Sequence, residues 1–196
     1  MDALRSLAVP TLLAFAACGA PPPAESPAPA SENPKPAVAP STVKRLPIAD
    51  FSELPASVAA FLEKRECTIP QADSVEGQSN VISGEFFETG VRTWAALCSR
   101  DGRSIALVFR DPDDRDPAAL ASIADNHCAN AQQPCSFAAN IQTVDPELIR
   151  QYDREVSGLT PPPIQHQGIE IVQPGEPAVV RYFHDGQWLE LLRLAD

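Results

Sequence analysis

An Asp-Gly pair between two uninterrupted apolar segments constrains the fold of this chain more than any other feature. The pair, Asp101-Gly102, separates residues 94–98 from residues 105–109. A tight two-residue turn needs positive φ angles, which Gly adopts freely and Asp tolerates, so the pattern predicts a β-hairpin. Residues 81–87 predict a third strand ahead of it. The hairpin strands are apolar at consecutive positions, so we expect both of their faces to be covered.

Further segments complete the predicted domain. Helices are expected over residues 55–65, 117–128 and 145–158, the last with Asp and Pro at its start and Gly at its end. Residues 168–172 predict a strand, and a second Asp-Gly pair at 185–186 predicts a C-terminal hairpin. The sequence therefore predicts an α+β domain. We expect an antiparallel sheet of about five strands, a three-stranded meander plus the hairpin, packed with two or three short helices.

The five cysteines predict disulfide bonds and one cysteine with another role. Cys18 stands apart at the end of the apolar N-terminal segment, which leaves four cysteines for pairing. We favour Cys67 with Cys98, which would tie a helix end to a central strand, and Cys128 with Cys135, which are close in sequence. Four buried reduced thiols are the alternative, and they are less typical of an exported protein.

The N-terminal segment predicts export. Residues 7–17 are apolar but too few to span a bilayer, and Arg5 precedes them, as in a signal peptide. Residues 15–19, Phe-Ala-Ala-Cys-Gly, resemble the lipobox of bacterial lipoproteins, although the family usually carries Leu where this chain has Phe15. The resemblance implies cleavage before Cys18, acylation of that cysteine, and anchoring in the bacterial outer membrane, facing the periplasm or the surface. Ordinary cleavage after residue 16 is the alternative.

The composition divides the chain into three parts. Residues 1–17 form the predicted signal peptide, and residues 18–44 are rich in Pro and Ala with almost nothing large to bury, which predicts a disordered tether. Residues 45–196 form the predicted single domain. The net charge of −11 argues against binding to nucleic acid and favours a basic protein or peptide as a partner. The membrane is expected to be contacted through the N-terminal lipid.

Part of the predicted meander resembles one degenerate unit of the FG-GAP or VCBS type found in β-propellers. Gly84-Glu85-Phe86, Gly90 and the Asp101-Gly102 turn carry the resemblance. These units bind calcium through a loop rich in Asp and Asn, but the matching residues here are Phe-Glu-Thr-Gly, which offer few oxygen ligands. Because no repeat recurs at a fixed period, a single meander is the favoured interpretation.

Candidate catalytic residues are few. The sequence contains no Gly-x-Ser-x-Gly, His-Glu-x-x-His, phosphate-binding glycine loop or Cys-x-x-Cys motif. His184 beside Asp185 forms one weak candidate pair, and Glu85 forms another with Glu88 or Glu190 across the sheet. No cofactor is predicted.

Candidate metal ligands lie in the acidic segment at residues 111–116. They are Asp111, Asp113, Asp114 and Asp116, but Arg115 occupies a position where a calcium loop would place an oxygen ligand. A solvated turn is the favoured interpretation. A zinc site built from His127, Cys128 and Cys135, with His166 or His184, is a weaker alternative than a disulfide.

Two functions fit these sequence features. The first is a lipid-anchored envelope lipoprotein whose domain is a non-catalytic binding module. The second is an envelope hydrolase with a carboxylate or a histidine at its centre. A hollow containing converging titratable groups would favour the hydrolase.

Overall fold

The computed structural model describes residues 43–125, 137–173 and 175–193, all within the unit Val38–Asp196. The described residues form ten strands, two α-helices and a 3-10 turn at Ile48–Asp50. The helices are α1 (Ala56–Lys64) and α2 (Pro146–Ser157). The strands are β1 (Arg45–Leu46), β2 (Ile69–Pro70), β3 (Val81–Gly84), β4 (Thr93–Arg100), β5 (Arg103–Phe109), β6 (Ala118–Ala124), β7 (Asn140–Val144), β8 (Gly168–Val172), β9 (Val179–His184) and β10 (Gln187–Leu192).

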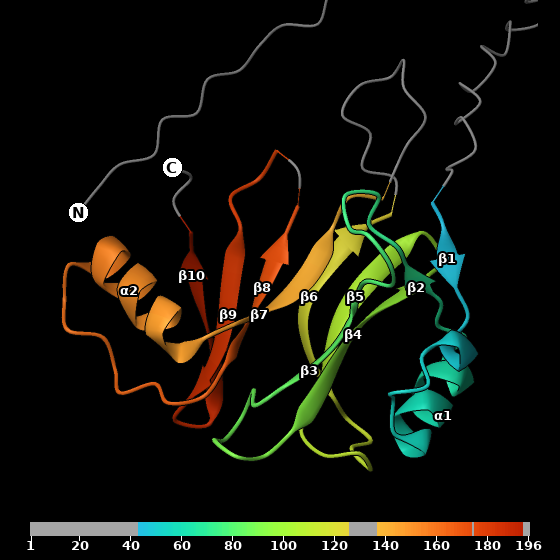
Figure 1. Cartoon of the computed structure of the whole chain (residues 1–196), viewed down its shortest axis with the longest axis horizontal. Helices are drawn as coiled ribbons and strands as arrows, with labels where there is room; N and C mark the ends of the chain where they lie inside the picture. Colours follow the sequence, from blue (N-terminus) through green and yellow to red (C-terminus); the bar gives the residue numbers. More distant parts are fainter. Residues whose placement is uncertain (1–42, 126–136, 174, 194–196) are drawn as a thin grey trace, which may run out of the picture. The chain divides into compact units, whose positions relative to one another are not determined.

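Two four-stranded antiparallel meanders form the centre of the domain (Figure 1). The first sheet has the order β3-β4-β5-β6, and the second has the order β10-β9-β8-β7. A separate two-residue ladder joins β1 to β2. The inner faces of the two large sheets share one apolar core, whose fully buried members include Phe86, Leu97, Val108, Phe137, Ile141 and Ile169. The domain therefore buries each sheet on the face that meets the other.

The helices cover the outer faces of the two sheets (Figure 1). Val58 and Leu62 of α1 pack on Leu107 and Phe109 of the first sheet. Ile149 of α2 packs on the second sheet in a smaller apolar cluster with Val144, Ile164, Val180, Tyr182 and Leu191. This coverage explains why the strands of the first hairpin are apolar at consecutive positions.

Asn80 connects the two sheets where β3 and β7 lie next to each other. Its Oδ1 accepts the Ile141 N–H at 3.0 Å, and its Nδ2 donates to the carbonyls of Pro70 at 2.7 Å and Ala139 at 3.2 Å. The residue is 1% exposed and has a φ of 69°. Asn is one of the few residues with a side chain that tolerates this left-handed conformation, so its backbone and its amide both suit the position.

The structure confirms the α+β class with antiparallel strands. Helices α1 and α2, the first hairpin, β8 and the C-terminal hairpin all lie where the sequence predicted them. The division of the strands differs from the single sheet of about five strands that we expected. The meander belongs to the first sheet and the C-terminal hairpin to the second, because β6 and β7 complete the two sheets separately.

The helix predicted over residues 117–128 is wrong, because residues 118–124 form strand β6. The segment is rich in Ala and lacks Gly and Pro after residue 117, so its local preference is helical. Pairing with the edge of β5 overrides that preference, through a ladder with a register shift between Ala106 and Leu107. Leu120 and Ile123 are buried by this arrangement.

The predicted disulfide between Cys67 and Cys98 is confirmed, with a Cα–Cα distance of 5.0 Å. It ties the chain just beyond α1 to the central strand β4. Cys18, Cys128 and Cys135 lie outside the described residues, as do the predicted signal peptide and all of the predicted tether except residues 43–44. Within the described part of the chain, none of the helices has the length and apolar character needed to cross a membrane.

Candidate functional site

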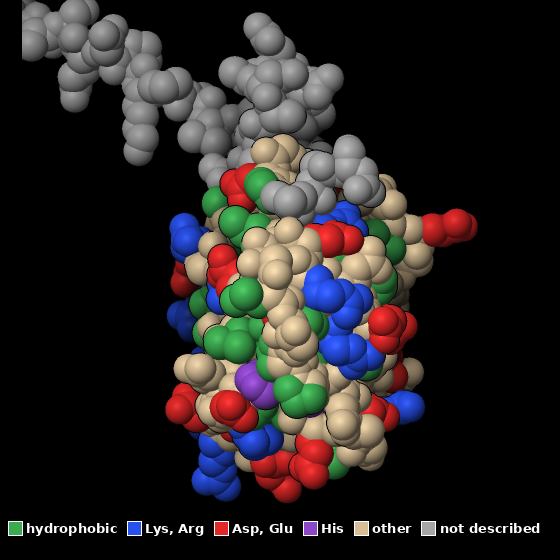
Figure 2. Space-filling model, turned by 90° about the vertical axis from the view of Figure 1, so that its left-hand side faces the viewer, with side chains coloured by type: hydrophobic (Ala, Val, Ile, Leu, Met, Phe, Trp, Pro, Cys, Tyr) green, Lys and Arg blue, Asp and Glu red, His purple; other side chains and the backbone are tan. Residues whose placement is uncertain are grey.

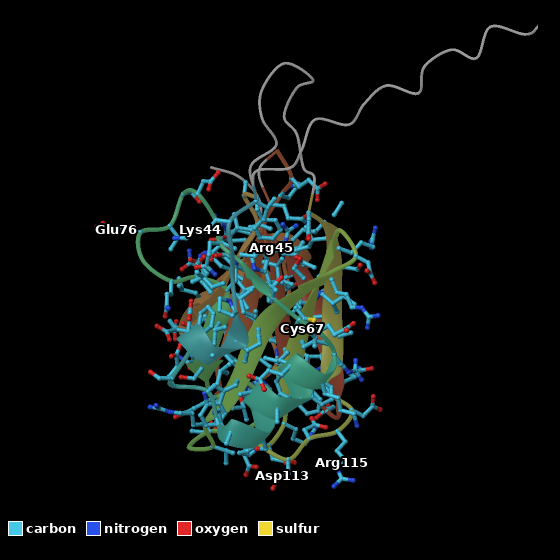
Figure 3. All side chains as sticks on the ribbon, turned by 90° about the vertical axis from the view of Figure 1, so that its right-hand side faces the viewer. Lys44, Arg45, Cys67, Glu76, Asp113 and Arg115 are labelled. Atoms are coloured by element: carbon cyan, nitrogen blue, oxygen red, sulfur yellow. A yellow bond between two sulfur atoms is a disulfide. The ribbon has the colours of Figure 1, made fainter. Side chains whose placement is uncertain are left out.

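An open hollow of 440 Å³ lies on the outer face of the first sheet, between the end of α1 and the β4–β5 hairpin. The hollow exists because α1 ends at Lys64, whereas the β4–β5 hairpin extends beyond the helix as far as the pair Arg100 and Arg103 at its turn. Glu66 turns the chain with a φ of 58°, and Cys67 then bonds to Cys98. Figure 3 views the molecule from this side, with Cys67 just above the upper end of the α1 ribbon.

The floor of this hollow is apolar. It consists of Cys98, Ile105 and Leu107. Cys98 and Leu107 are buried by the helix and the disulfide, whereas Ile105 is 38% exposed and is one of the large apolar side chains that solvent reaches. An apolar ligand group would therefore cover Ile105 without displacing any part of the protein.

Three arginines and one carboxylate stand around the apolar floor. They are Arg65, Arg100, Arg103 and Asp101, so the lining carries three positive charges and one negative charge. Arg100 Nε lies 3.1 Å from Asp101 Oδ2, and Arg100 Nη2 lies 3.7 Å from Glu66 Oε2. Arg103 donates to Ser122 Oγ at 2.8 and 3.1 Å. The net charge of the lining is therefore positive, whereas the net charge of the whole chain is −11.

Arg100 and Arg103 occupy directly opposite positions of the β4–β5 ladder. Like charges in directly opposite positions destabilise a sheet. Arg65 adds a third cation from the end of α1, where its guanidinium lies 4.4 Å from the centre of the Phe61 ring. The sequence alone does not mark these arginines as a group. The two-residue turn predicts the cross-strand pair, but only the tertiary fold brings Arg65 to it.

A buried polar cluster adjoins the hollow on the inner side of the same strands. The Asp125 carboxylate accepts hydrogen bonds from Ser99 Oγ at 2.5 Å, Ser104 Oγ at 2.6 Å and Arg45 Nη2 at 3.0 Å. Both hydroxyls are thus used as donors to one carboxylate. A smaller hollow of 310 Å³ shares Arg100 and Asp101 with the first and is lined by Arg45 and Ser99 of this cluster.

The structure brings the candidate catalytic residues His184 and Asp185 together. His184 Nε2 lies 3.4 Å from Asp185 Oδ2, and His184 shares a hollow of 380 Å³ with His166 and Glu88. Glu85 is joined to Gln167 through its main chain, which both donates to and accepts from that residue. Glu190 forms an ion pair with Arg181 at 2.5 Å. The expected carboxylate pair across the sheet is therefore replaced by an ion pair at Glu190.

The four aspartates of the acidic segment form a hydrogen-bonded turn. Asp111 Oδ1 accepts the Asp113 N–H at 2.8 Å, and Asp114 accepts the N–H groups of Arg110 and Asp116, both at 3.0 Å. In Figure 3, Asp113 and Arg115 lie at the opposite end of the domain from Arg45. Among the described residues, no three His, Cys, Asp or Glu side chains are arranged to hold a metal ion. His127, Cys128 and Cys135 of the zinc alternative lie outside these residues.

Two further surface features involve apolar groups. The rings of Phe87, Phe183 and Trp188 meet edge to face, and the Arg110 guanidinium lies over both Phe rings at 4.5 and 4.8 Å. Leu148 and Val156 of α2, Leu159 just beyond it, and Leu192 at the end of β10 are exposed. Figure 2 shows the side of the molecule on which α2 lies. In α2 the contact with the second sheet is made by Ile149 and Tyr152, so Leu148 and Val156 stay outside it.

Comparison of the chain with protein-family models, with curated proteins and with solved structures found no match. The assignment of function therefore depends on the geometry of the hollows and on the N-terminal sequence.

Proposed function

We propose that the chain is a lipid-anchored bacterial envelope lipoprotein whose domain is a non-catalytic binding module. The observation that carries the binding role is the hollow beside the disulfide. Its lining offers guanidinium donors and apolar surface, while its carboxylate, Asp101, is engaged by Arg100. The lining residues include no hydroxyl, imidazole or amine, and Cys98 is bonded to Cys67. Such a lining can hold a ligand but offers no nucleophile paired with a base.

The envelope location is supported by the cysteines and by the N-terminal sequence. Disulfides persist in oxidising compartments, and the Cys67–Cys98 bond fits an exported protein. Cys18, the residue that follows the predicted signal peptide, supplies the proposed site for the lipid. We further propose a basic protein or peptide as a partner for the acidic surface, tested by pulldown at low and at physiological salt. Binding that is indifferent to salt would argue against that partner.

Intact mass spectrometry of the protein extracted from membranes, without reduction, tests the anchored location. We expect a mature chain that begins at Cys18 and carries a diacylglycerol group. The matched Cys18→Ser variant should lose the acyl mass and leave the membrane fraction. A wild-type chain that begins elsewhere, or that carries an unmodified Cys18, would overturn the proposal.

A hydrolase is the second candidate, favoured by the hollow that contains His166 and His184. The Asp185 carboxylate is close enough to orient His184 as a general base. Hydrolysis of simple ester, amide or phosphoester substrates that is lost in His184→Ala and retained in the surface variant Arg154→Gln would support this candidate. Absence of turnover in the wild-type protein would count against it.

A further inference from the structure

We propose that the hollow beside the disulfide binds an organic anion with an apolar body, of the class of a carboxylate on a medium-length hydrocarbon chain. This inference rests on the proposed binding function and specifies its ligand. It follows from three properties of the hollow. These are the sign of its charge, the apolar chemistry of its floor, and a pair of arginines whose opposite positions in the ladder destabilise the sheet.

The charge of the hollow selects an anion. Three guanidinium groups and one carboxylate give the lining a net charge of +2, from three minus one, in a chain of net charge −11. Guanidinium groups present parallel N–H donors that match the two oxygens of a carboxylate. The bonds that Arg100 makes to Asp101 and Glu66 are between exposed groups, and such pairs contribute little to stability. An incoming carboxylate can therefore compete for Arg100.

The floor of the hollow selects an apolar body attached to the anion. Ile105 is exposed and lines the hollow together with the arginines and the buried Cys98 and Leu107. Inorganic phosphate or acetate would use the guanidinium groups but would leave Ile105 in water. A hydrocarbon chain would remove its surface from solvent and gain the hydrophobic contribution of that burial. The volume of 440 Å³ lies within the range typical of small-molecule sites.

The cross-strand pair Arg100–Arg103 indicates that this charge serves a ligand. The two residues are directly opposite in the ladder, which disfavours the folded sheet. Departures from local stability rules concentrate at functional sites, where binding offsets their cost. An anion between the two guanidinium groups would relieve their repulsion. The arrangement predicts that stability and binding respond in opposite directions when one of these charges is changed.

Calorimetric titration of the full chain carrying Cys18→Ser, which removes acylation and the need for detergent, tests the ligand. The probes are decanoate, acetate and decyltrimethylammonium. We expect saturable binding of decanoate and at least about tenfold weaker binding of the other two, because each lacks one of the required groups. Equal binding of decyltrimethylammonium, equal binding of acetate, or no binding of decanoate would each overturn the inference.

Variants in the same background locate the site. Arg103→Glu should weaken decanoate binding about tenfold or more and raise the melting temperature, because Glu opposite Arg100 replaces a repulsive pair by an attractive one. Ile105→Ser should weaken decanoate binding and leave the response to acetate unchanged. Arg154→Gln, on the exposed side of α2, is the matched control and should leave all three titrations unchanged.

The outcomes separate this inference from the proposed function. Decanoate binding that Arg103→Glu leaves intact would place the ligand elsewhere and overturn the site. Suppose that the Cys18→Ser chain does not bind decanoate while the mass spectrum shows that the wild-type protein is acylated. This result would overturn the ligand class alone, because anchoring is measured independently.

Discussion

Arg45 and Asp125, which are 80 positions apart in the chain, form an ion pair with Nη2 and Oδ2 separated by 3.0 Å. The carboxylate is 2% exposed, while the guanidinium is partly open to solvent. The pair joins β1 to the residue that follows β6. Two serine hydroxyls complete the hydrogen bonding of the carboxylate.

Asp125→Ala should destabilise the domain by about 3 kcal/mol or more, because it leaves Ser99, Ser104 and Arg45 without their common acceptor. Urea unfolding monitored by tryptophan fluorescence measures the loss. The control is Glu147→Ala, which removes an exposed ion pair with Arg150 and should cost less than about 1 kcal/mol. Equal losses in the two variants would contradict the role of the cluster.

Replacing Cys67 and Cys98 together by Ser should lower the free energy of unfolding by about 3 to 4 kcal/mol on the loop-entropy model. The bond closes a loop with a sequence separation of 31 residues. Chemical denaturation of the double variant in non-reducing buffer measures the change. An unfolding midpoint equal to that of the wild-type chain would show that the disulfide adds nothing to stability.

Asn80→Ala should destabilise the domain by about 2 to 4 kcal/mol, because it removes buried hydrogen bonds and places Ala at a positive φ. Asn80→Gly separates the two causes, since Gly keeps the backbone conformation and lacks the amide. In thermal and urea unfolding, we expect Asn80→Gly to show most of the loss of stability that Asn80→Ala shows. A Gly variant as stable as the wild type would assign the effect to the backbone alone.

Stability should fall at alkaline pH through Tyr182. Burial of its side chain raises the pKa of the phenol above its ordinary value, and the nearby Asp153 carboxylate raises it further. Because the pKa of Tyr182 is higher in the folded state than in the unfolded state, the phenol contributes fully to the free energy of unfolding at pH values below its unfolded-state pKa. This contribution is lost as the pH rises through the folded-state pKa. Tyr182→Phe should therefore flatten the alkaline fall in the free energy of unfolding.

Absorbance titration of tyrosinate and unfolding at several alkaline pH values measure this effect. The chain has two tyrosines, so Tyr152→Phe on α2 is the matched control and isolates the signal of Tyr182. An alkaline fall of the same size in Tyr182→Phe and in the wild type would contradict the prediction.

The turns of the fold could be predicted from sequence because their cause is local. Asp101 and Asp185 have φ angles of 51° and 49°, and the glycines that follow them have 76° and 83°. These are the positive values that two-residue hairpin turns require. The helix over Pro146–Ser157 was equally predictable, since Asp145, Pro146 and Gly158 mark its two ends.

Strand β6 and the binding hollow depend on contacts between distant segments. The residues of β6 favour a helix by themselves, and only the free edge of β5 makes them extended. Arg100 and Arg103 could be paired from the turn, but Arg65 reaches them through the turn at Glu66 and the disulfide that follows. The hollow that His166 and His184 line likewise depends on the pairing of β8 with β9, which brings the start of one strand next to the end of the other.

The short ladder at the start of the domain has a mechanical consequence. Arg45 and Leu46 pair with only two residues of β2, and the Arg45 side chain is bonded to Asp125 and Ser99. A pulling force applied at the N-terminal side would load the buried Val43, this ladder and this ion pair before it reached the strands of the two large sheets. The start of the domain therefore resists traction through core packing, a short ladder and an ion pair together.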